Sequence, residues 1–493
     1  MPFPFALPTT SSVSFSSSFS STTHPSLPLT ATTQRGVLRD VLKKHKRLAP
    51  QSRNANVSTV LSTLNHYLPY LLALDSGLSG TPVAGDEEVD VILACEPVFE
   101  WRNTLTSSPV PGREPPRAKL KSLEYEILFV LSVLAYTYTL LARAQLSVLF
   151  SSTTPTTEQR VAAVQTATRH LLQASSIHRY QVSRASQLDA PQQSSSPVDI
   201  SVTVLNALSA LALAEATLLV VLKDDPYPGI VSQDRNKDDR EWMIKAPEIP
   251  RVRAHLFARF CLAASEHSAK ASAILGGCGR GSTSNRVDET LVKYVETLRK
   301  TSRAKACRFL GIDADLGGKT GDAIAWLRAG KSELGMAVPS GVDDDSSKSS
   351  GLSKLKRQWN ERKEDRKIEQ GKEWGLDAGK LEEGRVLEML EQKWVKINDT
   401  INTQLIPPWN PLLANLPSGR DIPNVGPFNP PHLDESTLAK MRAPPEPGVR
   451  GFEGDEDDSE DDESGRRTGS QANMPPGAFP GTGQGNASNS SYY

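Results

Sequence analysis

The chain has 493 residues, with 56 Lys and Arg against 57 Asp and Glu and a formal net charge of -1. This length can hold two or three ordinary domains or one long helical array, and it is large enough to bury a core. The balanced charge lacks the basic footprint of a nucleic-acid binder, so we expect no nucleic-acid partner and only local electrostatic contacts.

The cysteines and the first residues indicate a cytoplasmic protein. The first basic residue is Arg35, whereas secretory signals and transit peptides carry basic residues near their start, so no targeting peptide is expected. The cysteines lie far apart, without a CxxC pair or histidines at metal-ligand spacing. We therefore expect no bound metal and no disulfide framework. The four residues, predicted to be reduced, are Cys95, Cys261, Cys278 and Cys307.

Strand signals are confined to the N-terminal third of the chain. Residues 12–19 (SVSFSSSF) alternate between polar and apolar side chains, and VDVIL (89–93) is followed by PVFEW (97–101). Alternation with period two and β-branched or aromatic residues are typical of strands. We expect a small β-hairpin that flanks the helices.

The rest of the chain is predicted to be all-α, because apolar residues recur with helical spacing over long segments. An early helix is marked by Leu38, Val41 and Leu42, and a second one contains NVSTVLSTLNHYLPYLLAL. The further predicted helices are residues 119–150, 157–188, 198–223, 251–275, 289–310, 320–334 and 355–402.

Two apolar runs, residues 127–142 and 204–225, could be mistaken for membrane spans. The first run ends at Arg143 and is shorter than the roughly 20 residues that a bilayer needs. The second contains Asn206 and Glu215, which are costly in hydrocarbon. Both are predicted to be buried core helices. The sequence leaves open whether Glu215 lies at a polar contact between helices or at a solvent-facing edge.

The character of the chain changes near its C-terminal end. After about Leu405 prolines exclude regular helix, while Trp409, Leu412 and Leu413 can still pack, so this segment is predicted to be an extended strap on the helical body. Residues 444–493 are acidic and then rich in Gly, Ser and Asn, a composition that cannot bury enough apolar surface to fold. We expect a disordered tail there.

The segment LGGKTGDAIAW (316–326) contains GKT, the end of a phosphate-binding loop. The full pattern requires glycine at position 313, where this chain has Asp313, and an apolar strand before the loop, where a helix is predicted. A turn that starts a helix is therefore the better interpretation. We expect no cofactor and no enzyme activity, although a catalytic triad scattered along the sequence would escape a search for motifs.

A basic stretch, residues 35–53, is the one local charge feature with a functional interpretation. Arg39, Lys43, Lys46 and Arg47 lie on or near one face of the predicted helix. Such a face can contact anionic lipid or an acidic partner. A solvated basic face without a partner is the more common alternative.

Several segments together resemble the Bro domain, the Alix-type helical module of endosomal-sorting adaptors. The resemblance covers most of residues 1–440 and implies a domain of residues 1–443, which would be a curved solenoid with a tetratricopeptide-like core. It also implies a partner, the C-terminal amphipathic helix of the core ESCRT-III filament subunit. The segments are LEYEILFVLSVLAYTYTLLARAQ (123–145), AVQTATRHLLQASSIHRYQ (163–181), LSALALAEATLLVVLK (208–223) and RAKACRFLGIDADLGGKTGDAIAWLRAG (303–330).

Within this family, the two ends are most similar to the fungal regulators of ambient-pH signalling. This similarity implies a scaffold that brings PalA and a calpain-like protease to ESCRT-III at the cell cortex or an endosomal membrane. The implied output is proteolytic activation of the transcription factor PacC. A general adaptor for endosomal cargo is the alternative. The matching pieces are MPFPFALPTTSSVSF, EPVFEWRNTL, TQLIPPWNPLLANLPSGRDI and LDESTLAKMRAPP.

The resemblance also implies three residues of a partner-binding groove. In Alix-type domains an aromatic residue at the end of one helix and two aliphatic residues at positions i and i+4 of the next helix accept the partner. The matching positions are Val220, Leu256 and Phe260, and the insertion from 224 to 250 leaves the register of the last two open. Residues with this spacing share a helix face. They are equally compatible with an ordinary core.

Overall fold

The computed structural model describes residues 1–444 apart from 84–86, 108–114, 151–155, 190–191, 194–195, 229, 231–248, 250, 279–285, 339–374 and 422–424. Contacts divide the chain into two compact units, Met1–Ala443 and Pro444–Tyr493. All the helices and strands that the structure describes belong to the first unit. The predicted disordered tail, from residue 445 on, lies outside the described residues, as does the part of the predicted helix 355–402 that precedes residue 375.

Helices dominate the first unit, which confirms the predicted fold class. The predicted helices are all present within the described residues, with ends that differ by a few residues from those expected. Their bounds are α1 (Leu27–Arg47), α2 (Pro50–Ser79), α3 (Leu123–Leu146), α4 (Thr157–Ala185), α6 (Val202–Asp224), α9 (Arg251–Gly277), α10 (Glu289–Leu316), α11 (Thr320–Glu333), α13 (Lys380–Ile397), α14 (Asn410–Ala414) and α15 (Glu435–Met441).

Local sequence explains where several of these helices begin and end. The Ser201 hydroxyl accepts from the Val204 N–H at the start of α6, and Thr156 forms a capping box with Gln159 at the start of α4. Gly80 ends α2 in the left-handed conformation, which glycine adopts without a steric penalty. These caps satisfy backbone groups that helix ends leave without partners.

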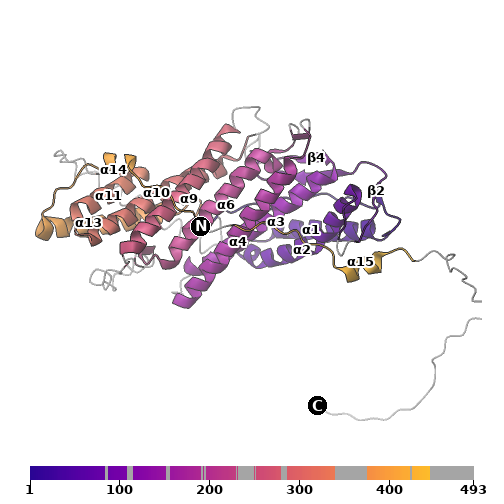
Figure 1. The fold of residues 1–493 in the computed structure, drawn as a ribbon, viewed down its shortest axis with the longest axis horizontal. Coiled ribbons are helices and arrows are strands. Elements are labelled where there is room, and N and C mark those ends of the chain that lie inside the picture. Colours follow the sequence, from indigo (N-terminus) through magenta and orange to yellow (C-terminus); the bar gives the residue numbers. More distant parts are fainter. Residues whose placement is uncertain are drawn as a thin grey trace, which may run out of the picture. The chain divides into compact units, whose positions relative to one another are not determined.

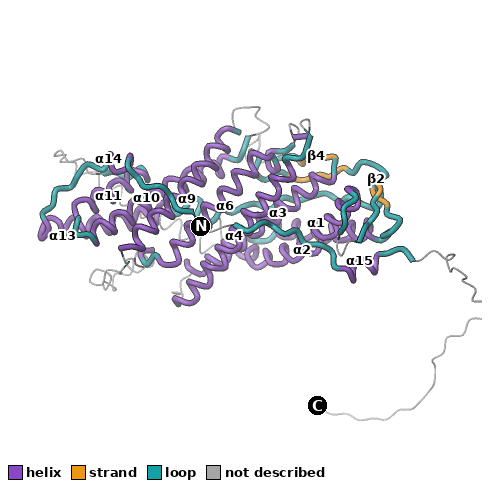
Figure 2. The backbone as a smooth tube through the Cα atoms, in the orientation of Figure 1, coloured by secondary structure: helices purple, strands orange, loops and turns teal. Residues whose placement is uncertain are grey.

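The long helices follow one another as a stack. α1 packs on α2, α2 on α3, α3 on α4, α4 on α6, α6 on α9, α9 on α10, α10 on α11 and α11 on α13. Figure 1 shows this succession as a gradual change of colour along the unit, and Figure 2 shows how little of the body is strand. Packing of each helix against the next is the arrangement of a helical solenoid, as predicted.

The strands form two antiparallel pairs rather than one hairpin. β1 (Phe19–Ser20) pairs with β2 (Ile92–Leu93), and β3 (Val98–Arg102) pairs with β4 (Arg117–Lys121). The prediction that a helix begins near Lys119 is wrong, because β4 occupies that position and α3 begins only after Ser122, whose hydroxyl accepts from the Glu124 N–H. β4 is short and has few apolar residues, so its sequence gave no strand signal.

The two helices whose sequences resemble membrane spans, α3 and α6, are core helices. α3 and α6 are long and apolar enough to span a bilayer, yet 78% of the most apolar window of each is buried inside the protein. Glu215, in α6, is 5% exposed and accepts a hydrogen bond from the Phe3 N–H, so it lies at a buried polar contact. This settles the alternative that the sequence left open.

The proline-rich segment after α13, the strap, returns along the helical body. It contains the short helices α14 and α15, so the expectation that prolines exclude regular helix there is wrong. Its residue Phe428 contacts the ring of Tyr180 in α4, at 5.5 Å between ring centroids. Near its end the Ala443 N–H donates to the Thr23 carbonyl, 2.7 Å away. The strap therefore connects the end of the stack that carries α13 to the N-terminal elements, and it appears as a loop along the body in Figure 2.

Candidate partner-binding site

The two α9 residues of the predicted groove lie on the outer side of that helix. Leu256 and Phe260 are half-buried, whereas Phe257, one position along, is 5% exposed and packs edge-on against Phe309 of α10 at 5.4 Å. Helical geometry places residues 256 and 260 on one face and turns Phe257 inward. Leu256 and Phe260 can therefore contact a partner while their helix stays anchored in the core.

Val220 occupies the corresponding position near the end of α6. It is half-buried, and its neighbour Val221 lies in the same core cluster as Ala254 and Phe257 of α9. The end of α6 thus packs beside the beginning of α9 through Val221. That the three predicted positions form a groove for a helix stays a prediction.

The strap crosses the same face of α9 further along the helix. The Arg420 N–H donates to the Arg259 carbonyl at 3.0 Å, and Nε2 of His267 lies 2.8 Å from a carboxylate oxygen of Asp421. Gly419 is packed so closely that a Cβ there would lie 2.6 Å from the Ala263 nitrogen. Since positions 256, 260, 263 and 267 share a face, strap and candidate groove are consecutive parts of one surface.

A buried ion network fixes the end of α6. The Arg308 guanidinium, which is fully buried, donates to Asp225 at 2.6 Å and to Glu383 at 2.7 Å. Burial alone would raise the pKa of both carboxyls, but the charge and hydrogen bonds of Arg308, together with the charge of Lys305, offset it and hold each pKa below its usual value. Lys305 adds a second cation at 2.9 Å from Glu383.

This network joins three helices around the candidate groove. Asp225 follows directly on α6, Arg308 belongs to α10 and Glu383 to α13. The guanidinium also lies over the rings of Tyr227 and Phe309, at 5.3 and 4.3 Å from their centroids. Sequence reasoning missed the network, because its members lie up to 158 positions apart and carry no motif (225 to 383).

A second buried network ties the strands to the helices. Both oxygens of Glu126 in α3 are bonded, one at 2.8 Å to Arg35 and one at 2.6 Å to the indole N–H of Trp101. Tyr67 donates to the same carboxylate at 3.1 Å, and Arg35 also reaches the Ser11 carbonyl. A buried carboxylate such as that of Glu126 is tolerated when ion-pair and hydrogen-bond partners satisfy it. These contacts join α1, α2, α3 and β3.

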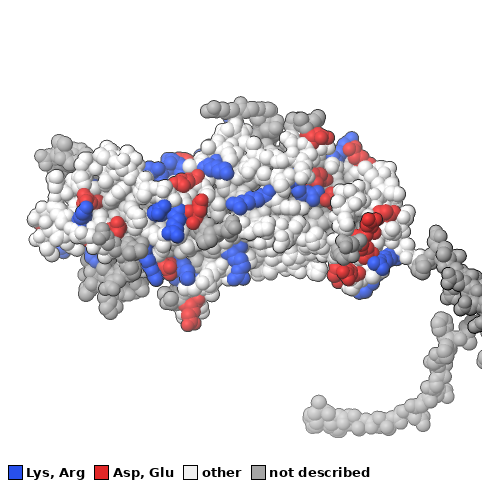
Figure 3. All heavy atoms as spheres, viewed as in Figure 1, with Lys and Arg blue, Asp and Glu red and all other residues white. Residues whose placement is uncertain are grey.

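The four basic residues of the predicted lipid or acidic-partner surface all lie in the second half of α1. Arg39 is paired with Asp40 at 2.9 Å and, like Lys43, is half-buried, whereas Lys46 and Arg47 are exposed. Helical spacing puts the four on one side of the helix. The face seen in Figure 3 carries acidic and basic side chains next to one another, which agrees with the balanced net charge.

The GKT segment is a turn between helices, as predicted. α10 ends at Leu316, Gly318 takes the left-handed conformation at φ 72°, and α11 begins at Thr320. The backbone N–H of Gly321 donates to the side chain of Gln404, in the strap, at 3.0 Å. The amide at this helix start is thus bonded within the protein.

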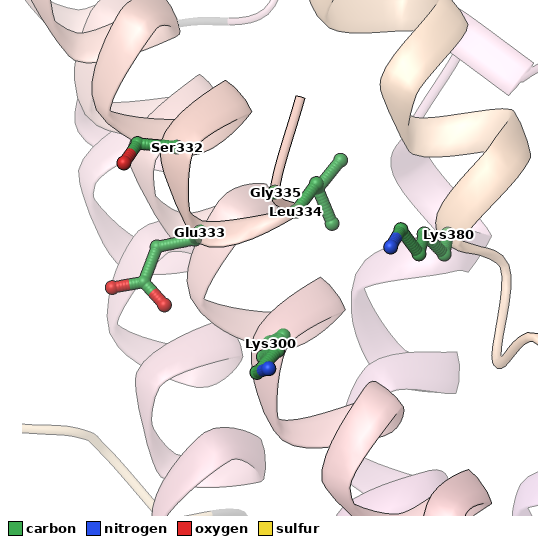
Figure 4. Close-up of a pocket in the computed structure, with 6 residues that line it drawn as sticks. All are labelled: Lys300, Ser332, Glu333, Leu334, Gly335 and Lys380. Carbon is green, nitrogen blue, oxygen red and sulfur yellow. The ribbon is translucent and has the colours of Figure 1, made fainter. Parts of the chain in front are cut away.

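An open pocket of about 350 Å³ lies between α10, the end of α11 and the start of α13 (Figure 4). The carboxylate of Glu333 is paired with Arg303 at 2.9 Å, and Lys300 is an exposed side chain. The pocket contains none of the predicted site residues. Its lining is Lys300, Ser332, Glu333, Leu334, Gly335 and Lys380.

Within the described part of the chain, no group of three or more His, Cys, Asp or Glu side chains could hold a metal ion. The four cysteines are free thiols. Burial raises the pKa of the Cys261 thiol to about 12, and it raises that of Cys307 as well. Such thiols are poor nucleophiles at neutral pH.

The stacked helices and their strap define a helical domain of one known family. Residues 38–408 match the BRO1-like domain, so the chain belongs to that family. It is 46% identical over 511 residues to the pH-response regulator protein palC of Emericella nidulans, an alignment that covers 98% of this chain and 99% of that protein. The resemblance found at the two ends of the sequence is thereby confirmed.

Two solved structures share the fold. The ALIX BRO1 domain in its complex with CHMP4C has a TM-score of 0.50 and 16% identity, and the match covers 87% of this chain and 95% of that one. ALIX in complex with the SIVmac239 PYKEVTEDL late domain has a TM-score of 0.54 and 16% identity, with 90% of this chain and 51% of that chain covered. At this level of identity the two structures establish the fold alone.

Proposed function

We propose that this protein is a non-enzymatic adaptor of ambient alkaline-pH signalling that binds the core ESCRT-III filament subunit. Its binding helps to assemble the complex that leads to proteolytic activation of PacC, with PalA and a calpain-like protease as direct or indirect partners. The observation that carries the proposal is the 46% identity to a pH-response regulator over nearly the whole chain.

The partner-binding surface in this proposal is the outer face of α9 together with the end of α6. Leu256 and Phe260 offer an apolar stripe, and Val220 borders it. An amphipathic helix binds such a stripe by placing its own apolar residues in the groove. The ALIX structure with CHMP4C supports this class of partner, because it shows a domain of the same fold with an ESCRT-III protein.

The experiment is a titration of the full chain with a peptide of the ESCRT-III core subunit's C-terminal helix. We expect saturable binding that Leu256→Asp or Phe260→Asp reduces at least tenfold, because the charge enters an apolar contact. Ala273→Asp is the matched control, since it adds the same charge at an exposed position of α9. Unchanged affinity in both groove variants, with melting temperatures near that of the wild type, would exclude this site.

A general cargo-sorting adaptor is the alternative, since the family and the fold are common to both functions. The two differ in the phenotype of a strain without the protein. We expect such a strain to fail to process PacC and to grow poorly at alkaline pH while sorting vacuolar cargo normally. Normal alkaline growth together with missorted cargo would favour the alternative.

The proposal also excludes nucleotide chemistry at the GKT turn. Its backbone amide at Gly321 is bonded to Gln404, and α10 rather than a strand precedes it. We therefore expect millimolar ATP with Mg²⁺ to leave the melting temperature of the protein unchanged, since a ligand raises it only by binding the folded state. A rise that depends on ATP concentration and is lost in Lys319→Ala would restore the enzyme hypothesis.

Recruitment to the cell cortex or to endosomes places the basic side of α1 near anionic lipid. We propose that Lys43, Lys46 and Arg47 contribute to this localisation in a protein that is otherwise cytoplasmic. The test is sedimentation with phosphatidylserine vesicles at low and physiological salt, because such contacts weaken as salt screens them. Binding that Lys46→Glu with Arg47→Glu does not reduce would assign these residues to a merely solvated face.

A further inference from the structure

The first residues of the chain are inserted between the central helices. The ring of Phe3 lies 5.2 Å from that of Tyr294 in α10, and the ring of Phe5 stacks on Tyr136 of α3 at 4.5 Å. Both phenylalanines are buried. Figure 1 shows the N-terminus beside α6, in the middle of the helical unit. This N-terminal segment, residues 1–5, therefore occupies a core position without belonging to a helix or strand.

The carboxyl group of Glu215 is central to the polar contacts of this segment. Oε1 of Glu215 accepts from the Phe3 N–H at 2.9 Å and lies 2.7 Å from the hydroxyl oxygen of Tyr294. The same hydroxyl lies 2.6 Å from the carbonyl oxygen of Met1. Oε2 of Glu215 is buried and has no hydrogen-bond partner within the described structure.

The hydrogen-bond geometry favours a proton on this carboxyl group. A tyrosine hydroxyl has one proton, so Tyr294 cannot donate to both Met1 and Glu215. If Glu215 is protonated, it can donate to the Tyr294 oxygen while Tyr294 donates to Met1, and each contact is satisfied. An ionised Glu215 leaves one of these short oxygen contacts without a proton and an unpaired charge in the core, which is costly.

The cations near Glu215 do not offset the effect of burial on its carboxyl group. Burial raises the pKa of Glu215 to about 7, even though Tyr294, Phe3, the amino group of Met1 and Arg143 act in the opposite direction. Arg143 in α3 donates to the Pro2 carbonyl at 2.6 Å. Burial also lowers the pKa of the Met1 amino group, so this cation is lost as the pH rises. A small cavity of about 80 Å³ beside Glu215 is also lined by the charged residues Asp225, Lys305 and Glu382. The charge of Asp377 acts to raise the pKa of the Met1 amino group.

We propose that residues 1–5 form a proton-linked latch, which is docked among α3, α6 and α10 while Glu215 carries a proton and is released when Glu215 loses it. The proton passes from the carboxyl group to solvent, and no other group is consumed. Release frees Phe3 and Phe5 and uncovers the rings of Tyr136 and Tyr294. The direction matches an alkaline signal, but the latch does not depend on the partner proposed above.

Hydrogen exchange of the full chain measures the latch directly. Exchange in residues 2–7 is followed by mass spectrometry at pH 6, 7, 8 and 9 in the wild type and in Glu215→Gln, which cannot ionise. The ratio of the two rates removes the intrinsic pH dependence of exchange. We expect this ratio to stay constant below pH 7 and to rise up to tenfold per pH unit above it. A ratio that is constant from pH 6 to 9 would overturn the proposal.

Glu382→Gln is the matched control, because Glu382 lines the same cavity and does not contact the N-terminal segment by a hydrogen bond within the described residues. It should keep the wild-type pH dependence, and a flat profile in this variant would place the relevant proton on Glu382 instead. If Glu215→Gln does not fold, the wild type still decides the matter. Exchange in residues 2–7 must then rise more steeply with pH than exchange in an α9 peptide of the same sample.

Discussion

Replacing Arg308 by methionine tests whether the buried ion network holds the end of α6. The change removes both guanidinium contacts of Asp225, whose carboxylate then keeps, among the described residues, the Tyr227 N–H at 3.2 Å. Glu383 retains Lys305. Removing one partner of a buried ion pair costs about 3–5 kcal/mol, because it leaves an uncompensated buried charge. We expect a loss of this size in the free energy of unfolding at pH 7.

The pH dependence of this loss has a defined sign. Arg308 lowers the pKa of Asp225 and Glu383 in the folded protein, so its contribution is present above their ordinary values near 4 and is lost as the pH falls through the lowered values. The gap in stability between the wild type and Arg308→Met should therefore be widest at neutral pH and should narrow toward acid. Urea unfolding of both proteins at pH 7, 4 and 3 measures the gap.

A double variant separates lost charge balance from lost packing. Arg308→Met combined with Asp225→Asn leaves the Lys305–Glu383 pair and no unpaired carboxylate in the network. Replacing buried ion pairs by neutral groups is often nearly neutral for stability. We expect the double variant to recover most of the loss. A single variant that costs less than about 1 kcal/mol, or a double variant no more stable than the single one, would refute the electrostatic explanation.

Three further changes are expected to have separate effects. The pKa of Glu215 is raised to about 7, so its contribution to stability is complete below its ordinary pKa near 4.5 and is lost as the pH rises. In urea unfolding, the stability of the wild type relative to Glu215→Gln should fall by about 3 kcal/mol between pH 4.5 and 7. A constant difference would contradict the assignment. Burial lowers the pKa of His178 to about 4. The free energy of unfolding of the wild type should therefore fall by about 3 kcal/mol relative to that of His178→Gln as the pH drops from 6.5 to 4. An equal pH dependence of stability in the two proteins would show that His178 is not buried in solution. Gly419→Val should detach the strap from α9, because its Cβ would lie 2.6 Å from the Ala263 nitrogen, and limited proteolysis near residue 419 should become faster; cleavage at the wild-type rate would refute this contact.

Helical periodicity was sufficient to predict the main body of the fold. The long segments around Leu38, Leu128 and Val204 contain enough apolar residues to bury a face or a whole helix, and the structure places these three residues in the core. Such a prediction fails at β4, where Arg117, Lys119 and Lys121 resemble an exposed helix start. Strand pairing there depends on β3, which is separated from β4 by a long connection, residues 103–116, instead of the short turn that marks a hairpin in a sequence.

The candidate site was predictable only in part. The spacing of Leu256 and Phe260 assigns them to one helix face, but the sequence could not reveal that the strap lies on the same face through Arg420 and Asp421. These contacts join residues more than 150 positions apart, and the bond of Arg420 uses backbone groups that every residue has. The role of Glu215 was hidden for a similar reason, because its partners come from the first residues of the chain.

The strap limits how a partner helix can bind to α9. Strap residues 418–421 contact α9 at Arg259, Ala263 and His267, so they reach the neighbour of Phe260, whereas Leu256 lies nearer the helix start. A helix that follows the stripe from residue 256 toward residue 267 must therefore end at the strap or displace it. The contacts between strap and α9 include exposed hydrogen bonds, each of which contributes little net free energy. A partner helix that buries an apolar face on α9 can therefore offset the loss of these bonds when it displaces the strap. If the strap acts as a competitor, Gly419→Val should strengthen peptide binding, and if it acts as an end wall of the groove, the same change should weaken binding.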